Sequence, residues 1–304
     1  MTKKLVIRLS NNLGNQMFMY ASAFAMSKRL NRQLFIDDET AYSGRKNIHK
    51  FDLDKLSISA QQAPSNLKFL GSVGYFKRKT LKYLDKLQNK KRFYTEHRDN
   101  NKFTSFDNNL VNGNYNDLLF VEGHFETEKY FSTFSSDIKK EFKFKYLNNF
   151  ENNSFLKEIK NSESVSICVR QNRFSERKRA ITNEDEKNSN IFTKDQINFI
   201  HKAVEIIKSK VDNPKFFLWS NDYHNLDNFF PNNLYTFVST NKIDLDLYLM
   251  SQSKHHIVIP SSFNWWGAWL GCSKNSLIIR PSVNHFSNFN LNNKDFWPVS
   301  WTIV

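Results

Sequence analysis

Short apolar segments alternate with helical segments along much of this 304-residue chain, and this alternation restricts the fold more than any other feature. The apolar segments have the length of buried strands and lie at residues 4–9, 33–36, 118–121, 165–169, 216–219, 257–259 and 277–279. The segments with helical character lie at residues 17–30, 126–134, 193–208, 243–253 and 261–270. Repeated strand–helix units of this kind predict an α/β fold with parallel, doubly wound sheets.

Polar segments follow four of the predicted strands, at residues 10–16, 170–173, 220–222 and 260–262. Ligands of such folds bind at the carboxyl ends of the strands, so we predict that these segments contribute to a binding site. The first segment lacks the glycines of the G-x-G-x-x-G fingerprint, which argues against a dinucleotide site. A polar run at residues 148–154 has the character of a linker and predicts two domains, residues 1–155 and 156–304.

The chain is strongly basic, with 44 Lys and Arg against 30 Asp and Glu and a net charge of +14. This charge favours anionic partners such as phosphorylated small molecules or an anionic membrane surface. Nucleic acid is not expected, because the sequence contains no nucleic-acid-binding motif. The densest basic stretch, residues 77–92, places Leu81, Leu84 and Leu87 at a spacing of three and predicts an amphipathic helix. That helix is either a solvated surface element or a peripheral membrane attachment.

The two cysteines, Cys168 and Cys272, have no metal-ligand spacing and are too few for a disulfide framework, which predicts a reducing compartment. No stretch approaches the roughly 20 apolar residues that a membrane-spanning helix needs. We see no signal peptide before the first predicted strand. The sequence therefore predicts a soluble or peripheral protein.

Three segments contain residues suited to anion binding or metal chemistry. Arg170 stands at a strand end, where its guanidinium is either a phosphate clamp or an ordinary surface cation. Ser261 and Ser262 precede a tryptophan-rich helix, so they are either helix caps or part of a phosphate site. Asp244 and Asp246 have the spacing of a metal-binding D-x-D motif, but the apolar pattern around them predicts the first turn of a helix and no metal.

Two longer stretches resemble a known family. The sequence GNQMFMYA at residues 14–21, and DLYLMS at residues 246–251 followed by SSFNWWGAWL at residues 261–270, closely resemble signatures of glycosyltransferase family 11, the α-1,2-fucosyltransferases. These matches lie at both ends of the chain and in the family's order, whereas residues 40–150 carry little of the resemblance.

The resemblance implies the GT-B arrangement, in which two Rossmann-like domains with parallel sheets face a central cleft. It implies inverting transfer of L-fucose from GDP-fucose to a sugar hydroxyl, O2 of galactose, with no metal or other cofactor. Bacterial members build surface polysaccharide such as O-antigen. The implied partners are an oligosaccharide acceptor with a terminal galactose, lipid-linked or not, and the inner face of the bacterial membrane, with a cytoplasmic location.

Position by position, the resemblance assigns roles to residues of this chain. The implied catalytic residues are Arg170, which would hold the β-phosphate of the leaving GDP, and Asn15 and Gln16, which would face the pyrophosphate or the fucose. The implied donor-binding residues are Gly14, Arg173, Asp222, Asp246, Ser261, Ser262 and Phe263. Among them, the position of Asp246 recognises guanine in related fucosyltransferases.

The chain departs from the family's H-x-R-R-x-D motif at three positions. Cys168 stands in place of the histidine, Gln171 in place of the second arginine and Arg173 in place of the aspartate. Arg173 is therefore a candidate to assist the phosphate beside Arg170. The catalytic base stays open, and the acidic residues that follow the motif are Glu176, Glu184 and Asp185. Two alternatives also stay open: a transferase that uses another GDP-sugar, and a non-catalytic protein that binds a nucleotide or an anionic surface.

Overall fold

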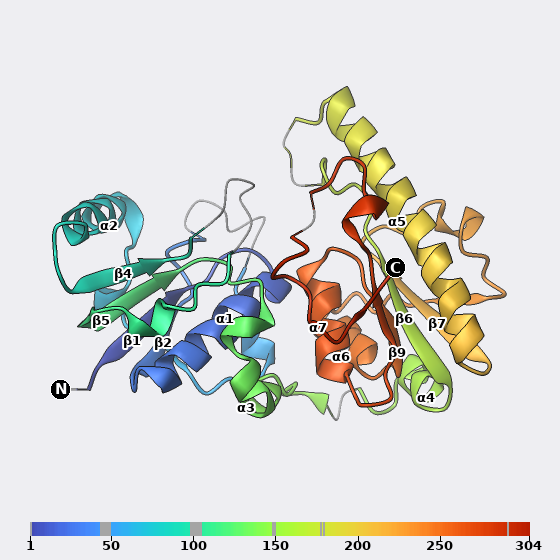
Figure 1. Ribbon diagram of the computed structural model, residues 1–304, viewed down its shortest axis with the longest axis horizontal. Helices are drawn as coiled ribbons and strands as arrows, with labels where there is room; N and C mark the ends of the chain where they lie inside the picture. Colours follow the sequence, from blue (N-terminus) through green and yellow to red (C-terminus); the bar gives the residue numbers. More distant parts are fainter. Residues whose placement is uncertain are drawn as a thin grey trace. The chain divides into compact units, whose positions relative to one another are not determined.

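The computed structural model describes residues 2–42, 50–97, 105–147, 150–176, 178, 180–290 and 292–304. They form two compact α/β units (Figure 1). The N-terminal unit consists of Met1–Lys145 and Lys294–Pro298, and the C-terminal unit consists of Tyr146–Asn293 and Val299–Val304. The chain thus passes from one unit to the other after Lys145, earlier than the division at residue 155 suggested by the sequence, and a short segment near the C-terminus returns to the N-terminal unit.

The sheet of the N-terminal unit has five parallel strands in the order β3-β2-β1-β5-β4. The strands are β1 (Lys4–Arg8), β2 (Gln33–Asp37), β3 (Gln61–Gln62), β4 (Lys91–Thr95) and β5 (Tyr115–Glu122). Strand β1 lies at the centre, where Leu5 pairs with Leu34 of β2 and Leu119 of β5. Three consecutive apolar residues of β1 are buried, as expected for a parallel strand that is covered on both faces.

The N-terminal unit contains the helices α1 (Leu13–Arg29), α2 (Gly71–Asp85) and α3 (Ser135–Glu141). Its 3-10 turns are η1 (Leu53–Lys55), η2 (Ser65–Leu67), η3 (Leu110–Asn112), η4 (Glu128–Tyr130) and η5 (Ser132–Phe134). Helix α1 is buried along most of its length, whereas α2 lies beside the edge strand β4 and keeps one face exposed (Figure 1). The returning segment joins this unit through Asp295, which binds Lys129 at 2.7 Å, and through Phe296, whose ring centre lies 6.1 Å from that of Phe18.

The sheet of the C-terminal unit has six parallel strands in the order β11-β10-β9-β6-β7-β8. The strands are β6 (Glu163–Val169), β7 (Pro214–Ser220), β8 (Tyr235–Phe237), β9 (His255–Ile257), β10 (Ile278–Arg280) and β11 (Thr302–Ile303). Strand β6 is central and pairs with β7 over its whole length. The loops that follow β6, β7 and β9 therefore leave neighbouring strands at the same edge of the sheet.

The helices of the C-terminal unit are α4 (Ser154–Lys160), α5 (Asn183–Lys210), α6 (Ile243–Ser251) and α7 (Ser262–Gly271), with 3-10 turns η7 (Leu226–Asn228) and η8 (Val283–His285). Figure 1 shows α5 on one face of this sheet and α6 with α7 on the other. Helix α5 supplies Ile200 and Val204 to a core that includes Ile167 of β6. Helices α6 and α7 approach closely at Gly267, where a Cβ atom would lie only 2.4 Å from the sulfur of Met250.

The predicted α/β fold with parallel sheets is confirmed, but the start of the first helix was placed too late. Helix α1 begins at Leu13, so that Gly14, Asn15 and Gln16 belong to its first turn instead of a preceding loop. The stretch 126–134 was also wrong as a continuous helix, because it contains the two short turns η4 and η5. Among the helices that the structure describes, none combines the length and apolar character needed to cross a bilayer.

The start of the helix predicted at residues 193–208 was also placed too late. Helix α5 begins at Asn183, and its capping box is formed by Thr182, whose hydroxyl accepts a hydrogen bond from the N–H of Asp185 at 3.2 Å. The side chain of Gln196 binds the backbone of Arg170, the first residue after β6. Gln196 therefore lies inside α5 and makes a tertiary contact with the end of β6.

Candidate functional site

The loops that follow β6 and β7 are joined by hydrogen bonds. The N–H of Gln171 donates to the side-chain oxygen of Asn221 at 2.9 Å, and the Asn221 amide donates back to the Gln171 carbonyl at 3.0 Å. The Gln171 side chain donates to the carbonyl oxygens of Asp222 at 2.8 Å and His224 at 3.1 Å. Gln171, which replaces an arginine of the family motif, therefore fixes one strand-end loop to the next.

Asp222 stabilises the same pair of loops. Its Oδ2 accepts a hydrogen bond from the Asn172 amide at 3.0 Å, and its Oδ1 accepts one from the N–H of His224 at 3.0 Å. Asn172 has a φ of 57°, in the left-handed region that asparagine tolerates better than most residues. A surface depression of about 560 Å³ is lined by Asn172, Glu176, Asn221 and Asp222, among others. Asp222 thus has contacts that favour a positioning role beside this depression.

Arg170 is the first residue after β6, and its backbone is fixed by Gln196 of α5. The N–H of Arg170 donates to Oε1 of Gln196 at 2.9 Å, and its carbonyl accepts from Nε2 at 2.7 Å. The Arg170 side chain is 23% exposed, and its guanidinium forms an ion pair with Glu176. Because Gln196 is fully buried, it fixes the position of the Arg170 backbone at the end of β6. A bound phosphate would compete with Glu176 for the Arg170 guanidinium.

Arg173 connects the loop after β6 to the turn before α7. Its Nη1 donates to the carbonyl of Pro260 at 3.0 Å. Its guanidinium lies 4.9 Å from the ring centre of Phe192 and 4.2 Å from that of Phe289, in cation–π contact with both. These contacts favour Arg173 as a residue that positions the turn at Ser261 over a direct phosphate ligand.

Ser261 and Ser262 lie at the start of α7, where the sequence placed them. Ser261 occupies the N-cap position, and its carbonyl accepts the N–H of Trp265 at 2.9 Å. Within the described part of the chain, the Ser261 hydroxyl does not cap the helix, and the first turn, which includes the half-buried Phe263, has no acidic side chain. The first N–H groups of an α-helix have no partner inside the helix, so this end of α7 is suited to an anion.

Buried residues of α7 hold this turn in place. Oδ1 of Asn264 accepts a hydrogen bond from the N–H of Ile259 at 2.8 Å, which ties the helix start to the chain that follows β9. Trp265 and Trp266 are fully buried, and their rings meet edge to face at 4.9 Å. The tryptophans therefore serve packing, whereas at the start of the helix Ser261 is buried and Ser262 is partly exposed.

Asp246 lies in the first turn of α6, as the helical interpretation of the D-x-D spacing predicted. Its Oδ1 accepts a hydrogen bond from the Thr240 hydroxyl at 2.9 Å. Burial raises the pKa of Asp246, although Thr240 and the indole of Trp219 oppose this shift. A carboxylate here has acceptor capacity for the N–H groups of a nucleobase. In the described ranges, no three His, Cys, Asp or Glu residues gather in a way that would hold a metal ion.

Cys168 occupies the motif position of the family's histidine and is partly buried. Burial raises the pKa of Cys168 to about 12, with an opposing contribution from Arg170 and a further upward one from Asp246. A raised pKa favours the neutral thiol over the thiolate.

In the N-terminal unit, Gln16 is a fully buried residue in the first turn of α1. Its Nε2 donates to the carbonyls of Asn11 at 2.8 Å and Lys50 at 2.7 Å. Its Oε1 accepts the N–H of Asp52 at 2.9 Å. Gln16 therefore connects the loop after β1 to residues 50–52, and its contacts favour a positioning role.

Asn15 reaches a second strand end of the same unit. Its Nδ2 donates to Oε1 of Glu126 at 2.8 Å, while Nδ2 of Asn11 lies 2.9 Å from Nε2 of His124. Gly14 is buried beside them in the same helical turn. The ends of β1 and β5 thus bring together two amides, an imidazole and a carboxylate, which is a set able to bind sugar hydroxyls and to accept a proton.

The loop that presents His124 and Glu126 is held by a buried carboxylate. Glu96 accepts hydrogen bonds from the N–H groups of His124 at 2.8 Å and Phe125 at 2.7 Å. Phe125 has a φ of 53°, which is unfavourable for a bulky residue, and a Cβ atom on Gly123 would lie 2.3 Å from Cβ of Glu96. The loop therefore has a fixed, strained conformation that Glu96 stabilises.

His124 and Glu126 were not among the predicted site residues, although the sequence contained a signal for them. Residues 118–121 were predicted as a strand, so the same strand-end argument applies to the residues that follow it. The acidic residues named instead have other partners: Glu176 pairs with Arg170, and Asp185 pairs with Lys178 at the start of α5.

Two α/β units with parallel sheets, each with polar residues at the carboxyl ends of its strands, have the architecture of GT-B glycosyltransferases. The sequence pattern of Glycosyl transferase family 11 matches residues 1–304, and the chain therefore belongs to this family.

Two curated relatives from Escherichia coli match most of the chain. An alpha-1,2-colitosyltransferase is 28% identical over 309 residues, which cover 99% of this chain and 98% of the relative. The O-antigen biosynthesis glycosyltransferase WbnK is 23% identical, with 90% of this chain and 92% of the relative covered.

Solved structures with the same fold include fucosyltransferases. A mutant of Arabidopsis thaliana FUT1 in complex with GDP gives a TM-score of 0.56 at 13% identity, covering 94% of this chain and 72% of that chain. POFUT1 in complex with GDP-fucose gives a TM-score of 0.51 at 13% identity, covering 91% of this chain and 98% of that chain.

Proposed function

We propose that this chain transfers L-fucose from GDP-fucose to O2 of a galactose residue, with inversion at the anomeric carbon and without a metal. Membership of family 11 supports sugar transfer, and the relative named alpha-1,2-colitosyltransferase supports the α-1,2 linkage. The fold shared with FUT1 and POFUT1, which bind GDP and GDP-fucose in their structures, supports a GDP-sugar donor. The relative WbnK supports an O-antigen oligosaccharide as acceptor, free or linked to lipid at the inner face of the membrane.

The observation that carries the proposal is the connection between the loop after β6, which begins with Arg170, and the turn before α7. Arg173, three residues after Arg170, binds the carbonyl of Pro260, the residue before Ser261. A diphosphate in this region would receive the Arg170 guanidinium, displaced from Glu176, and the N–H groups at the start of α7. Both stabilise the negative charge that develops on the β-phosphate as its oxygen separates from C1 of the sugar.

The other half of the reaction requires a base. The acceptor hydroxyl oxygen bonds to C1 from the side opposite GDP, which converts a β-linked donor into an α-linked product. Its proton passes to a carboxylate, and the candidate in the N-terminal unit is Glu126, whose Oε1 accepts a hydrogen bond from Asn15 at 2.8 Å. Asp246 completes the donor site in this proposal, because its carboxylate can accept hydrogen bonds from the N–H groups of guanine.

GDP-colitose is the second candidate donor, because the relative that is 28% identical over 99% of the chain is named a colitosyltransferase. A donor panel separates the candidates: purified protein is incubated with GDP-fucose, GDP-colitose or GDP-mannose and terminal β-galactosides, with and without EDTA. We expect transfer from GDP-fucose at an unchanged rate in EDTA. Preferential transfer from GDP-colitose would replace the donor assignment, loss of activity in EDTA would contradict the metal-free mechanism, and no transfer from any donor would favour a non-catalytic binding protein.

The role of Glu126 can be tested by Glu126→Gln. We expect kcat to fall by about 10²- to 10⁴-fold, the range of general-base contributions, with little change in KM for the donor. Glu205→Gln, a change at an exposed carboxylate of α5, is the matched control and should keep full activity. If Glu126→Gln retained wild-type kcat and the same pH profile, another group would have to accept the proton.

A further inference from the structure

Helix α2 presents its apolar side chains to solvent. Val73, Phe76, Tyr83 and Leu87 are 82%, 64%, 67% and 78% exposed. These four residues, here called the outer stripe, recur at the spacing that places them on one side of a helix, and Leu87 continues the helical path through an N–H bond to the carbonyl of Leu84. The sequence pattern of leucines was misleading, because Leu81 is half-buried while Leu87 belongs to the exposed side.

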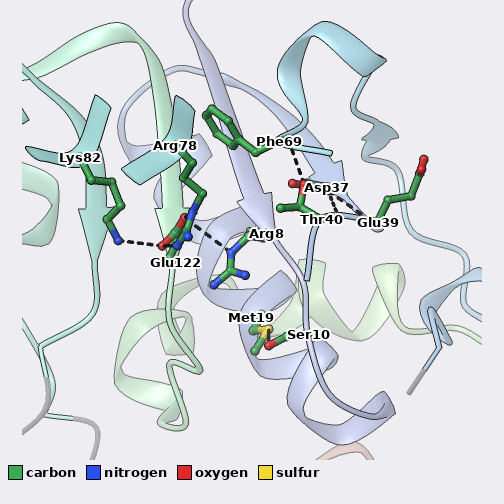
Figure 2. A network of polar contacts seen from close by, with 10 residues as sticks. All are labelled: Arg8, Ser10, Met19, Asp37, Glu39, Thr40, Phe69, Arg78, Lys82 and Glu122. Carbon is green, nitrogen blue, oxygen red and sulfur yellow. Dashed lines mark hydrogen bonds and ion pairs between the residues drawn. The ribbon is translucent and has the colours of Figure 1, made fainter. Parts of the chain in front are cut away.

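The opposite side of α2 is fixed to the sheet, so the outer stripe cannot turn inward. Glu122, at the end of β5, accepts hydrogen bonds from Nε of Arg78 at 2.5 Å and from Lys82 at 2.9 Å (Figure 2). Asp85 is buried and accepts the N–H groups of Arg92 at 2.7 Å and Phe93 at 3.1 Å. The helix is therefore held by its polar side and displays its apolar side.

Lysines border the outer stripe without acidic counterparts. Lys77, Lys79, Lys86 and Lys90 are exposed, and none of them lies in an ion pair within the described part of the chain. Asp85 is the sole acidic residue of α2, and it is buried. An apolar stripe with a cationic border is the pattern of helices that lie in the interface of an anionic membrane.

We propose that α2 is a membrane-docking helix, in which the outer stripe enters the boundary between headgroups and acyl chains of an anionic bilayer and the bordering lysines bind lipid phosphates. The proposal does not depend on the identity of the donor sugar.

A second copy of the chain is the main competing occupant, because the outer stripe has the spacing of a coiled-coil seam. Lys77, Lys79 and Lys86 occupy the positions that flank such a seam, where coiled coils place complementary charges. Pairing two copies of α2 would bring these lysines to one interface without an acidic partner, because Asp85, the sole acidic residue of α2, is buried. Anionic lipid provides the charge that a second copy lacks.

The docking helix and the candidate acceptor loop share one anchor. Glu122 binds Arg78 and Lys82 of α2 and is followed directly by Gly123 and His124 of the loop that presents Glu126. A lipid surface under α2 would thus be connected through one buried carboxylate to the loop proposed to receive the acceptor sugar. This arrangement suits an acceptor that is attached to a membrane lipid.

The test is flotation of the full-length protein with two kinds of vesicle, pure phosphatidylcholine and phosphatidylcholine with about 30% phosphatidylglycerol. We expect binding to the anionic vesicles only. Phe76→Ser/Leu87→Ser should reduce that binding at least about tenfold, and Lys77→Gln/Lys86→Gln should reduce it by about fivefold per lysine. Neither variant should change transfer to a soluble acceptor, so failure of docking and failure of the proposed function can be distinguished.

Matched controls lie outside α2. Leu234→Ser/Val299→Ser removes two apolar residues that are 57% and 92% exposed, and Lys210→Gln/Lys274→Gln removes the same charge from the C-terminal unit. Both should bind anionic vesicles like the wild type. The proposal is overturned if the wild type ignores anionic vesicles, if the α2 variants bind as well as their controls, or if sedimentation shows a dimer that Phe76→Ser/Leu87→Ser dissociates while vesicle binding persists.

Discussion

Arg170→Ala is expected to lower kcat/KM by about 30- to 1,000-fold, which corresponds to ~2–4 kcal/mol of lost transition-state stabilisation. The guanidinium stands at the end of β6 with Glu176 as its partner, so a diphosphate that displaces Glu176 gains a charge-assisted contact. The variant should remain folded, because Gln196 holds the backbone of residue 170 and not its side chain. Steady-state kinetics with GDP-fucose and circular dichroism check the two expectations.

Two further variants sharpen this prediction. Arg170→Lys keeps the charge but not the planar fork, so its activity should lie between those of the wild type and the alanine variant. Arg92→Ala removes an exposed arginine from the N-terminal unit and should leave kcat/KM unchanged. Equal activity of Arg170→Ala and Arg92→Ala would mean that Arg170 does not contact the leaving group.

The second large effect concerns stability. Glu122→Ala is expected to destabilise the N-terminal unit by about 3–5 kcal/mol, because it leaves the cations around a buried carboxylate without their partner. Glu122 is 5% exposed at its side chain and lies beside Arg8 at 3.5 Å and Lys82 at 2.9 Å, and Figure 2 shows these side chains and Arg78 converging on it. Urea unfolding and hydrogen exchange in β5 and α2 measure the loss.

The control for Glu122 is a similar pair at the surface. Glu163 and Lys254 lie 2.6 Å apart, but their side chains are 42% and 46% exposed. Exposed pairs contribute at most about 1 kcal/mol, so Glu163→Ala should have a small effect. Losses of equal size in the two variants would mean that the Glu122 network contributes no more than a surface ion pair.

The same carboxylate makes stability depend on pH. Burial alone would raise the pKa of Glu122, but hydrogen bonds from Arg78 and Lys82 and the charge of Arg8 outweigh it and lower the pKa below its ordinary value of 4.5. A group with a lowered pKa in the folded state stabilises the fold fully above its unfolded pKa. This contribution is lost as the pH falls through the folded pKa, so the difference between wild type and Glu122→Ala should shrink in acid.

The sequence predicted the seven inner strands and their polar ends, because buried parallel strands are continuous apolar runs. It did not predict the edge strands β3, β4, β8 and β11. It failed where a side chain acts far from its own position. Gln16 was assigned to a loop, yet it lies in the first turn of α1. Its side-chain amide forms hydrogen bonds with the backbone of Lys50 and Asp52. Arg173 remains a candidate to assist the phosphate, but its cation–π contacts with Phe192 and Phe289 could not be predicted. The spacing of residues along the sequence does not predict such contacts.

The set of site residues predicted in the N-terminal unit was incomplete for a different reason. A strand was predicted at residues 118–121, but the residues after it were not considered as part of the site. The structure places His124 beside Asn11 and Glu126 beside Asn15, which joins a predicted amide to an unpredicted carboxylate. The sequence also could not predict which side of α2 is exposed. Helical spacing shows that a helix is amphipathic but not which side faces the protein.

The most direct test of the central claim is the structure of the product. The protein is incubated with GDP-fucose and a terminal β-galactoside, and the new linkage is determined by NMR. We expect an α-linked fucose on O2 of galactose together with one released GDP for each sugar transferred. A product with the β-anomer, or fucose on a different hydroxyl, would contradict inverting α-1,2 transfer by this chain.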